Sequence, residues 1–354
     1  MAYTTINDPT AYFQTKLYTG NSSTQSITFD GNTNMQPDWV WIKSRSAAEW
    51  HQVHDSVRSV AKYLFTNENQ AEGERSPNDQ VTSFNSNGFS LGAGANDSVN
   101  SNGGSYASWN WKAGTSVSGN TGGSGTAKSY TGSVNTDAGF SIITYTGNGT
   151  AGHTIPHHLS AVPNIVLTKG RSAALNWFFF DSMSSYLKRL KLNTTDAQAD
   201  TDGLNDTAPT SSVFTVSGGG EGNTNGATYV AYLFSEKQGF SKFGTYIGNG
   251  ASSANSGTFV YTGFKPSFVI VKNTDTEGWQ MWDNKRSSYN GQGSNISPNS
   301  GNAESTGVRV HFFSNGFQLV SSGADQNSSG ATFIFMSFAE QPLVTSTGVP
   351  ATAR

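Results

Sequence analysis

Apolar and polar residues alternate over short stretches along this chain, and clusters of Gly, Asn, Ser and Asp interrupt them at regular intervals. A period of two is typical of strands that bury one face. Asn-Gly pairs are frequent among the interruptions and favour tight hairpin turns, because both residues tolerate positive φ. Two such pairs lie between aromatic residues, within Phe84–Phe89 and Phe313–Phe317, and predict hairpins there. The pattern as a whole predicts an all-β chain of antiparallel strands.

One run of features occurs three times. Each run opens on a Tyr-x-Gly-Asn turn, continues with a proline, an apolar stretch and a lysine, then a tryptophan and an aspartate, and closes on an aromatic strand. From the opening tyrosine to the closing aromatic residue the separations are 88, 84 and 87 residues. A constant period predicts one module used three times. The openings are Tyr18–Asn21, Tyr145–Asn148 and Tyr246–Asn249; the middle segments are Pro37–Lys43, Pro163–Lys169 and Pro266–Lys272; the closing strands are Tyr106–Trp111, Tyr229–Phe234 and Phe333–Phe338.

The repeat divides the chain into three compact modules, each near the usual domain size. We expect three tandem antiparallel β-sandwiches of the jelly-roll or concanavalin-like kind, because two packed sheets suit many short strands better than a barrel. The stretch between the first two modules is rich in Gly, Ser and Thr and predicts a flexible linker, which would leave the first module freer than the others. The predicted ranges are 1–114 for module 1, 115–135 for the linker, 136–238 for module 2, 239–345 for module 3 and 346–354 for a flexible tail.

One segment allows two interpretations. Between Asp55 and Phe65 the apolar residues Val57, Val60 and Leu64 have helical spacing, and Asp55 could cap a short helix. The matching segments of the other modules do not repeat this spacing. A turn that leads into a strand is therefore an equal alternative.

Composition narrows the class of protein. Charged residues make up 13% of the chain, the formal net charge is -3, and cysteine is absent. The chain lacks the basic surface that nucleic acid would need, and it can form neither disulfides nor thiolate metal sites. No apolar stretch is long enough to span a membrane, and the first residues do not resemble a secretion signal, so we expect a soluble protein. The 8 Trp, 13 Tyr and 22 Phe can fill thin β cores.

The tryptophans of the repeat, Trp50, Trp177 and Trp279, have two interpretations. An aromatic residue kept in every module is most simply part of the core. An exposed indole could instead stack on a pyranose ring. Trp50, with His51 and His54 beside it, is the candidate ligand-contact group of the chain.

Two further groups, three histidines and an acidic loop in module 2, suggest metal binding only weakly. The histidines do not recur in the other modules, so positions on the surface are the better interpretation. The acidic loop lacks the bidentate Glu of a calcium-binding loop. We therefore expect no cofactor and treat the loop as solvated, with calcium as the alternative. The histidines are His153, His157 and His158, and the acidic residues are Asp196, Asp200, Asp202 and Asp206.

The search for catalytic motifs finds neither a nucleophile elbow, nor a zinc-protease motif, nor a phosphate loop. One carboxylate recurs in each module, as Asp55, Asp181 and Asp283. A glycosidase needs two opposed carboxylates, and no second one recurs with these. An aspartate that follows a strand more often caps a turn.

Four blocks of the chain resemble proteins encoded by marine bacteriophages, in which a similar Trp-Asn-Trp-Lys-Ala-Gly block closes one sandwich and a Gly/Ser linker follows. The resemblance extends over essentially the whole chain and implies a virion structural protein with tandem lectin-like β-sandwiches. It implies no catalytic or ligand residue. Module 2 departs from the pattern, because Phe234-Ser-Glu-Lys replaces Trp111-Lys-Ala-Gly. The similar blocks are Tyr106–Gly114, Asp8–Gly20, Gly239–Gly244 and Val260–Pro266.

Together these observations predict a non-enzymatic protein on the virion surface, either a head decoration or a short tail appendage, which adsorbs to host surface glycans. Its expected partners are other capsid or tail proteins and host polysaccharide, with many copies on each particle. We keep three alternatives: a virion-associated polysaccharide depolymerase or glycosidase, a tail-fibre receptor-binding protein, and a secreted bacterial adhesin. A sandwich that starts within the first twenty residues, without a shaft or heptads, favours the compact forms.

Overall fold

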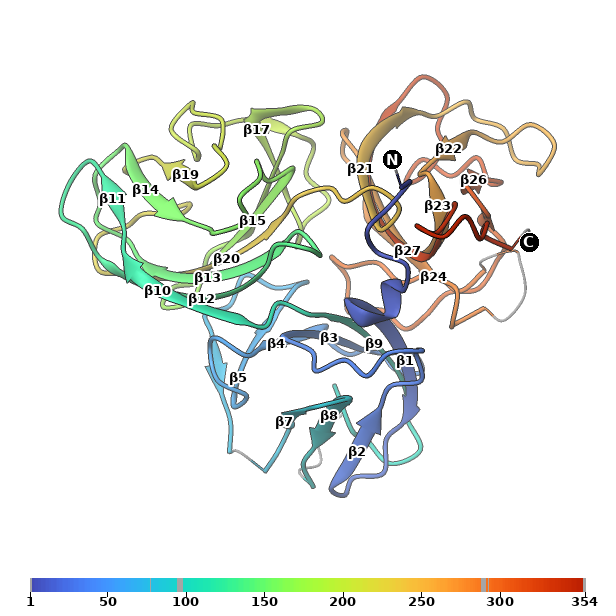
Figure 1. The fold of residues 1–354 in the computed structure, drawn as a ribbon, viewed down its shortest axis with the longest axis horizontal. Helices are drawn as coiled ribbons and strands as arrows, with labels where there is room; N and C mark the ends of the chain where they lie inside the picture. The colour runs from blue at the N-terminus through green and yellow to red at the C-terminus, as the bar shows by residue number, and fades with distance from the viewer. Residues whose placement is uncertain (1, 77, 94–97, 288–290, 292, 353–354) are drawn as a thin grey trace.

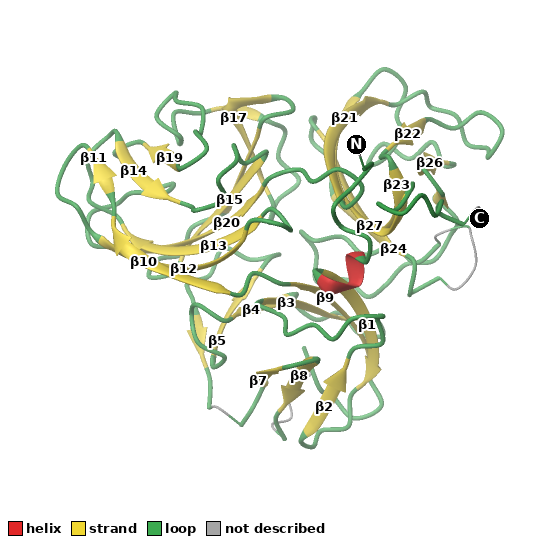
Figure 2. Cartoon of the chain, viewed as in Figure 1, coloured by secondary structure: helices red, strands yellow, loops and turns green. Residues whose placement is uncertain are grey.

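The computed structural model describes residues 2–76, 78–93, 98–287, 291 and 293–352, and shows an antiparallel all-β chain arranged in three lobes around a common centre (Figure 1). We call the lobes unit 1 (residues 8–111), unit 2 (115–234) and unit 3 (241–342). Each contains one larger sheet and one three-stranded sheet. The helix seen in Figure 2 is the three-residue η1 (Pro9–Ala11), and no helix in the described residues is long and apolar enough to span a membrane.

In unit 1 the larger sheet has the order β1-β9-β3-β4-β5-β6 and the smaller one the order β2-β8-β7. The strands of the larger sheet are β1 (Phe13–Thr19), β9 (Ser105–Trp111), β3 (Trp39–Ser44), β4 (Gln52–Asp55), β5 (Lys62–Phe65) and β6 (Gly73–Glu74). Those of the smaller sheet are β2 (Gln25–Thr28), β8 (Gly88–Leu91) and β7 (Val81–Asn85).

Units 2 and 3 repeat this plan. In unit 2 the sheets have the orders β10-β12-β13-β20-β15-β16-β17-β18 and β11-β14-β19, and in unit 3 the orders are β21-β27-β23-β24 and β22-β26-β25. The strands of unit 2 are β10 (Thr115–Asn120), β11 (Gly122–Gly123), β12 (Ser129–Asn135), β13 (Phe140–Thr146), β14 (His153–Pro156), β15 (Ile165–Gly170), β16 (Trp177–Asp181), β17 (Ser185–Lys191), β18 (Ala199–Asp200), β19 (Val213–Val216) and β20 (Thr228–Phe234). Those of unit 3 are β21 (Ser241–Ile247), β22 (Phe259–Tyr261), β23 (Phe264–Asn273), β24 (Trp279–Asp283), β25 (Val310–Phe313), β26 (Gly316–Leu319) and β27 (Thr332–Pro342).

The pairing register makes residues of the three units equivalent. The strands β1-β9-β3-β4, β13-β20-β15-β16 and β21-β27-β23-β24 follow the same order. The recurring aspartate ends the fourth strand of each set. It pairs with the first residue of the apolar stretch, which lies on the third strand. These pairs are Trp39 with Asp55, Ile165 with Asp181 and Phe268 with Asp283.

The central strands of each larger sheet are buried on both faces. One face packs on the smaller sheet of its own unit, so each unit has an apolar cluster of its own. The other face packs on the larger sheets of the other two units, in a single cluster of aromatic and aliphatic residues at the centre. The units are therefore not independent beads, because they share one core. The ring contacts that join them include Trp39 with Tyr232 at 4.5 Å, Trp111 with Phe268 at 5.9 Å and Phe179 with Trp279 at 5.2 Å between centroids.

Residues 115–135 are not the flexible linker that their composition predicts. They form β10, β11 and β12, which extend the larger and smaller sheets of unit 2. Val117, Tyr130 and Val134 pack into the core of that unit, which holds the stretch in place. The greater freedom expected for the first module is also wrong, since its larger sheet supplies part of the central core.

The helix considered for Asp55 to Phe65 does not form. The Asp55 side chain accepts hydrogen bonds from the Val57 and Arg58 amides at 3.0 and 2.8 Å, which closes a turn that leads into β5. The tail predicted at 346–354 turns back in its described part, where Ser346 donates its amide to Asn7 at 2.7 Å, and residues 353–354 lie outside the described residues.

Both predicted aromatic hairpins form, as β7–β8 and β25–β26. Gly88 and Gly316 begin the second strand of each hairpin. A Cβ at Gly88 would lie 2.0 Å from the Ile27 carbonyl oxygen, and one at Gly316 would lie 2.2 Å from that of Val260. Glycine is required there because the neighbouring strand passes so close.

The opening Tyr-x-Gly-Asn turns are held by a buried asparagine in each unit. Asn100, Asn223 and Asn327 are fully buried. In each unit the asparagine side-chain oxygen accepts the amide of the last residue of the turn, and its amide group donates to at least two acceptors in the surrounding loops. The turn contacts are Asn21 to Asn100 at 3.0 Å, Asn148 to Asn223 at 2.9 Å and Asn249 to Asn327 at 3.1 Å.

Candidate functional site

The recurring aspartates lie where the three units meet. Asp55, Asp181 and Asp283 are 0 to 1% exposed, so none of them faces solvent. Each caps the turn after its strand, as Asp283 does by accepting the Lys285 and Arg286 amides at 3.0 and 2.9 Å. The turn-capping interpretation of these residues is thus confirmed, and the second carboxylate oxygen of Asp55 and of Asp283 also accepts a bond from a neighbouring unit.

At the boundary between units 1 and 2 these contacts form a buried chain of charges. Arg58 donates to Asp55 at 2.5 Å and to Glu72 at 3.0 Å. Arg171 of unit 2 donates two hydrogen bonds of 2.9 Å to the Glu72 carboxylate. The Tyr232 hydroxyl, also of unit 2, donates to Asp55 at 2.6 Å. Every charge in the chain therefore has an opposite charge as its neighbour.

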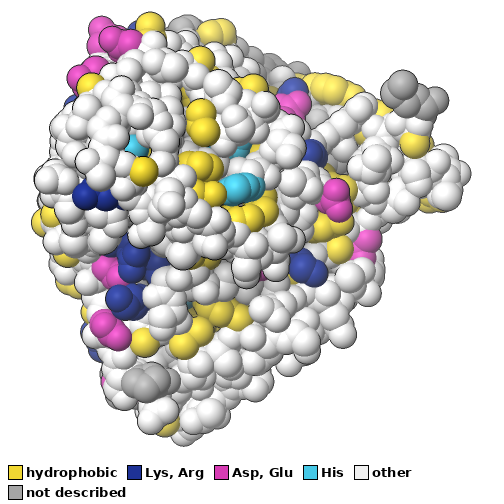
Figure 3. All heavy atoms as spheres, turned by 60° about the vertical axis from the view of Figure 1, so that its left-hand side comes forward, with side chains coloured by type: hydrophobic (Ala, Val, Ile, Leu, Met, Phe, Trp, Pro, Cys, Tyr) yellow, Lys and Arg dark blue, Asp and Glu magenta, His cyan; other side chains and the backbone are white. Residues whose placement is uncertain are grey.

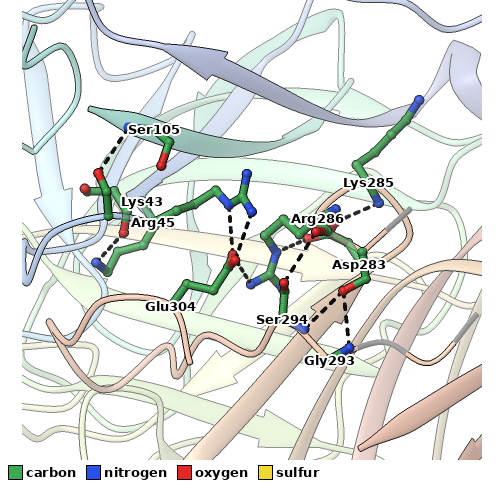
Figure 4. Close-up of polar contacts among 12 residues, drawn as sticks. Lys43, Arg45, Ser105, Asp283, Lys285, Arg286, Gly293, Ser294 and Glu304 are labelled. Atoms are coloured by element: carbon green, nitrogen blue, oxygen red, sulfur yellow. Dashed lines mark hydrogen bonds and ion pairs between the residues drawn. The ribbon is translucent and has the colours of Figure 1, made fainter. Parts of the chain in front are cut away.

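The boundary between units 3 and 1 repeats the arrangement (Figure 4). Glu304 lies between the guanidinium groups of Arg45 and Arg286, at 2.9 and 3.3 Å, while Asp283 lies on the far side of Arg286 at 2.5 Å. The Trp109 indole of unit 1 donates to Asp283 at 3.0 Å, in the place that Tyr232 takes at the other boundary.

The boundary between units 2 and 3 has the same geometry with uncharged partners. Ser184 stands at the position of the arginine and donates to Asp181 at 2.8 Å. Gln198 replaces the glutamate and donates to Ser184 at 2.5 Å, and Thr274 replaces the second arginine. The pairing register places Met336 at the position equivalent to Tyr232 and Trp109, and its side chain has no donor for Asp181.

A backbone hydrogen bond marks the equivalence of the three boundaries. In each, the amide of the glutamate or glutamine donates to the carbonyl of the arginine or threonine in the next unit, so the contacts run in a ring from unit 1 to 2, 2 to 3 and 3 to 1. The bonds are Glu72 to Arg171 at 2.8 Å, Gln198 to Thr274 at 2.7 Å and Glu304 to Arg45 at 2.9 Å.

The arginines favour the ionised form of the two glutamates at the charged boundaries. Although burial opposes it, the arginines lower the pKa of Glu72 and of Glu304. Burial raises the pKa of Asp181, which has no cation beside it. A general acid or base must exchange protons with a substrate. These carboxylates are closed off by protein partners, and the arrangement is that of a structural junction.

Three buried lysines follow the apolar stretch of the repeat. Burial lowers the pKa of Lys43, Lys169 and Lys272 to about 8. Each ammonium donates to backbone carbonyls, and that of Lys169 reaches unit 1, where it bonds Asn69 at 3.3 Å and Gln70 at 2.8 Å.

The structure separates the three predicted tryptophans. Trp177 and Trp279 are buried in the central core, as predicted, and their indoles donate across unit boundaries, to the Phe65 carbonyl at 2.7 Å and the Lys191 carbonyl at 2.9 Å. Trp50 is 41% exposed, so the core interpretation is wrong for it.

The physical reason is a shift of one residue. Counted back from the aspartate that ends the strand, the residue equivalent to Trp177 and Trp279 is His51. The His51 ring is fully buried beside the Ser297 and Ser300 backbone of unit 3, and burial lowers its pKa well below the usual value. Trp50 precedes the strand and packs edge-on against Phe65 at 4.7 Å.

The candidate group Trp50, His51 and His54 therefore does not form one surface. His54 is fully buried, its pKa is lowered to about 4 by burial, and its ring lies 3.3 Å from the Gln52 side chain and 3.2 Å from the Val60 carbonyl. Only Trp50 presents a ring to solvent.

The histidines of unit 2 are dispersed, and two of them are not at the surface. His153 is buried between Asn223 and Thr121, at 2.8 and 2.6 Å. His157 is also buried, and burial lowers its pKa to about 4. His158 lies 2.8 Å from the Tyr130 hydroxyl. The prediction of surface positions is thus wrong for the first two.

The acidic loop of unit 2 is exposed at each of its four aspartates. Asp196 forms an ion pair with Lys191 at 2.6 Å. Within the described residues, no group of three or more His, Asp or Glu side chains comes together in a way that could hold a metal ion.

A groove of about 530 Å³ runs between units 1 and 2. Its wall in unit 1 includes Gln36, Asp38 and Ser56, and its wall in unit 2 is formed by β10 and β12. Asp38 accepts hydrogen bonds from the Ser56 hydroxyl at 2.6 Å and the Ala113 amide at 2.9 Å, so both of its carboxylate oxygens are bonded within the protein. The residues that line the groove include several serines and threonines and no aromatic residue.

Sequence reasoning missed the partners of the aspartates. The signal was present in part, since Asp-x-x-Arg occurs in units 1 and 3 and Lys-x-Arg in units 1 and 2. It was obscured because each motif is absent from one unit. The asparagines Asn100, Asn223 and Asn327 had a clearer signal, as each stands six residues before the closing aromatic residue.

Comparison with known proteins adds one assignment. Neither the curated proteins nor the solved structures contain a match to the chain. The family model described as "Domain of unknown function (DUF7483)" matches residues 8–342, a range that includes all three units and their boundaries. The chain belongs to this family.

Proposed function

We propose that this chain is a non-enzymatic structural protein on the surface of a bacteriophage particle, built from three lectin-like sandwiches of jelly-roll or concanavalin-like type. The observation that carries the proposal is the position of the recurring aspartates. Each is buried and bonded at a unit boundary, so the carboxylate that recurs in the repeat is part of a junction. The location on a phage particle is proposed from the resemblance of the sequence to phage proteins.

The architecture suits a rigid component that presents a large polar surface. The visible face in Figure 3 is covered mainly by uncharged polar side chains and backbone, with scattered charges. Such a surface can make many weak contacts with host glycans, and copies on one particle would add their affinities by raising the effective concentration. Capsid or tail proteins are the proposed attachment partners, for a head decoration or a short tail appendage.

The location is tested by mass spectrometry of purified virions, in which we expect this chain in many copies per particle. Its absence from particles that infect normally would refute the proposal. The non-enzymatic character is tested separately by incubating the protein with host polysaccharide, where no release of reducing ends is expected. Release that is lost in an Asp→Asn variant would show an enzyme instead.

A further inference from the structure

The smaller sheet of unit 3 carries exposed aromatic side chains on its outer face. Phe259 and Tyr261, both on β22, are 46% and 54% exposed. Phe313, on β25, lies 6.0 Å from Phe259 between ring centroids, and His311 lies 6.3 Å from Phe313. Apolar side chains gathered on one solvent-facing surface mark an interaction site more often than scattered ones do.

Strand alternation fixes the direction of these rings. Val260, between the two exposed residues, packs into the core of unit 3 together with Phe317 of β26. Side chains of neighbouring residues on a strand point to opposite faces. The outer face is therefore made of two cross-strand rows, Phe259–Gln318–His311 and Tyr261–Gly316–Phe313.

Unit 1 shows that the fold does not need these aromatic residues. Its smaller sheet has the same strand order, and the pairing register identifies the equivalent residues. All of them except the glycine are small and polar. The equivalent rows are Ser26–Ser90–Ser83 and Thr28–Gly88–Asn85. In unit 2 the outward positions of β14 and β19 hold Thr154 with Thr215 and Pro156 with Val213, and none of these residues is aromatic.

We propose that this aromatic face of unit 3 binds a neutral polysaccharide built from pyranose rings. The face of an aromatic ring carries negative charge density, which attracts the polarised C–H groups on one side of a pyranose. The six residues include no Asp, Glu, Lys or Arg, so no permanently charged side chain of this face favours a charged sugar. Gln318 and His311 supply polar groups between the rings. The inference rests on the proposed adsorption to glycans and names its ligand class and site.

The test uses the full chain and exchanges the face for that of unit 1. In the variant Phe259→Ser/Tyr261→Thr/Phe313→Asn, each aromatic residue takes the identity found at its equivalent position. Native gels that contain dextran, laminarin or galactomannan measure binding as retarded migration, and a gel with anionic alginate tests charge selectivity. We expect at least one neutral polysaccharide to retard the wild type, and the triple variant to lose that retardation.

Ile247→Thr is the matched control, because Ile247 is an apolar residue of unit 3 that is 56% exposed but lies on the other sheet. We expect it to migrate like the wild type. Circular dichroism of the triple variant must match the wild type before its migration is compared.

Several results would overturn the inference: no retardation by any neutral polysaccharide, equal retardation of wild type and triple variant, or retardation by alginate alone. Light scattering adds another, since a wild-type dimer that the triple variant cannot form, without retardation, would assign the face to a second copy of the chain. Detection of the chain in virions does not depend on these gels, so failure here would leave the proposed location standing.

Discussion

The two boundaries of unit 2 share a backbone arrangement but differ in charge. Toward unit 1, the chain of contacts is Asp55, Arg58, Glu72 and Arg171, whereas toward unit 3 serine, glutamine and threonine replace everything but the aspartate. Buried ion pairs repay little more than their desolvation cost. The uncharged boundary indicates that the backbone bond and the shared aromatic core hold the units together. We infer that the charged residues determine which unit packs against which.

The largest effect should come from removing one charge out of the middle of a network. Arg286→Ala leaves Asp283 and Glu304 buried without their common partner, which should lower the free energy of unfolding by about 3–5 kcal/mol. The equivalent change at the uncharged boundary, Ser184→Ala, removes only hydrogen bonds and should cost at most about 2 kcal/mol. Chemical denaturation of both variants measures the difference, and equal losses would contradict our view of the boundaries.

The buried lysines should make stability depend on alkaline pH. In the folded chain Lys43, Lys169 and Lys272 have a pKa of about 8, against 10.5 when exposed. Between these values the unfolded chain binds more protons than the folded one, so the free energy of unfolding rises with pH, by about 1.4 kcal/mol per pH unit for each proton. The free energy of unfolding should stop rising near pH 10. There the tyrosines of the unfolded chain lose their protons, whereas burial raises the pKa of Tyr232 in the folded chain and keeps it protonated.

Lys169→Met sharpens this test, because Lys169 alone among the three bonds across a boundary. Denaturation curves between pH 8 and 10 should show about two thirds of the wild-type slope in this variant. A slope unchanged from the wild type would mean that Lys169 remains protonated in the folded chain throughout this range.

A smaller loss is expected from the hydroxyl that crosses the boundary of units 1 and 2. Tyr232→Phe removes the donor to Asp55 and should cost about 1.5–3 kcal/mol, as for a buried hydrogen bond to a charged group. Tyr145→Phe is the control, since that hydroxyl donates to the neutral Gly222 carbonyl at 2.9 Å and should cost about 1 kcal/mol. If calorimetry gives the two variants the same melting temperature, the charge of Asp55 contributes nothing to the contact.

Much of the architecture could be predicted from local patterns. The repeat, the strands and the aromatic hairpins follow from alternation and turn residues, which act over a few positions. The burial of Trp177 and Trp279 followed from their recurrence. Local pattern failed in residues 115–135, because their many Gly, Ser and Thr residues suit a linker as well as they suit strands. Only Val117, Tyr130 and Val134 of this stretch join the apolar core of unit 2.

The boundaries could not be predicted because their partners lie far apart in the chain. Arg45 meets Glu304 across 259 residues, and no local period reports such a contact. Recurrence misled in one place, since the tryptophan of module 1 stands one residue before the equivalent position. A one-residue shift moves a strand residue to another environment, so Trp50 became exposed while His51 took the buried place.

The smallest effect should follow from converting one charged boundary completely. The variant Arg45→Thr/Arg286→Ser/Glu304→Gln gives the boundary of units 3 and 1 the three uncharged residue types found at the boundary of units 2 and 3. Replacing a whole buried network is often nearly neutral, and Asp283 would keep its two turn amides and the Trp109 donor, as Asp181 is kept by Ser184 without a cation. We expect a loss of about 1 kcal/mol in chemical denaturation, well below that of Arg286→Ala alone. A triple variant less stable than the single one would show that the charges themselves hold this boundary, and the uncharged boundary would then need a different source of stability.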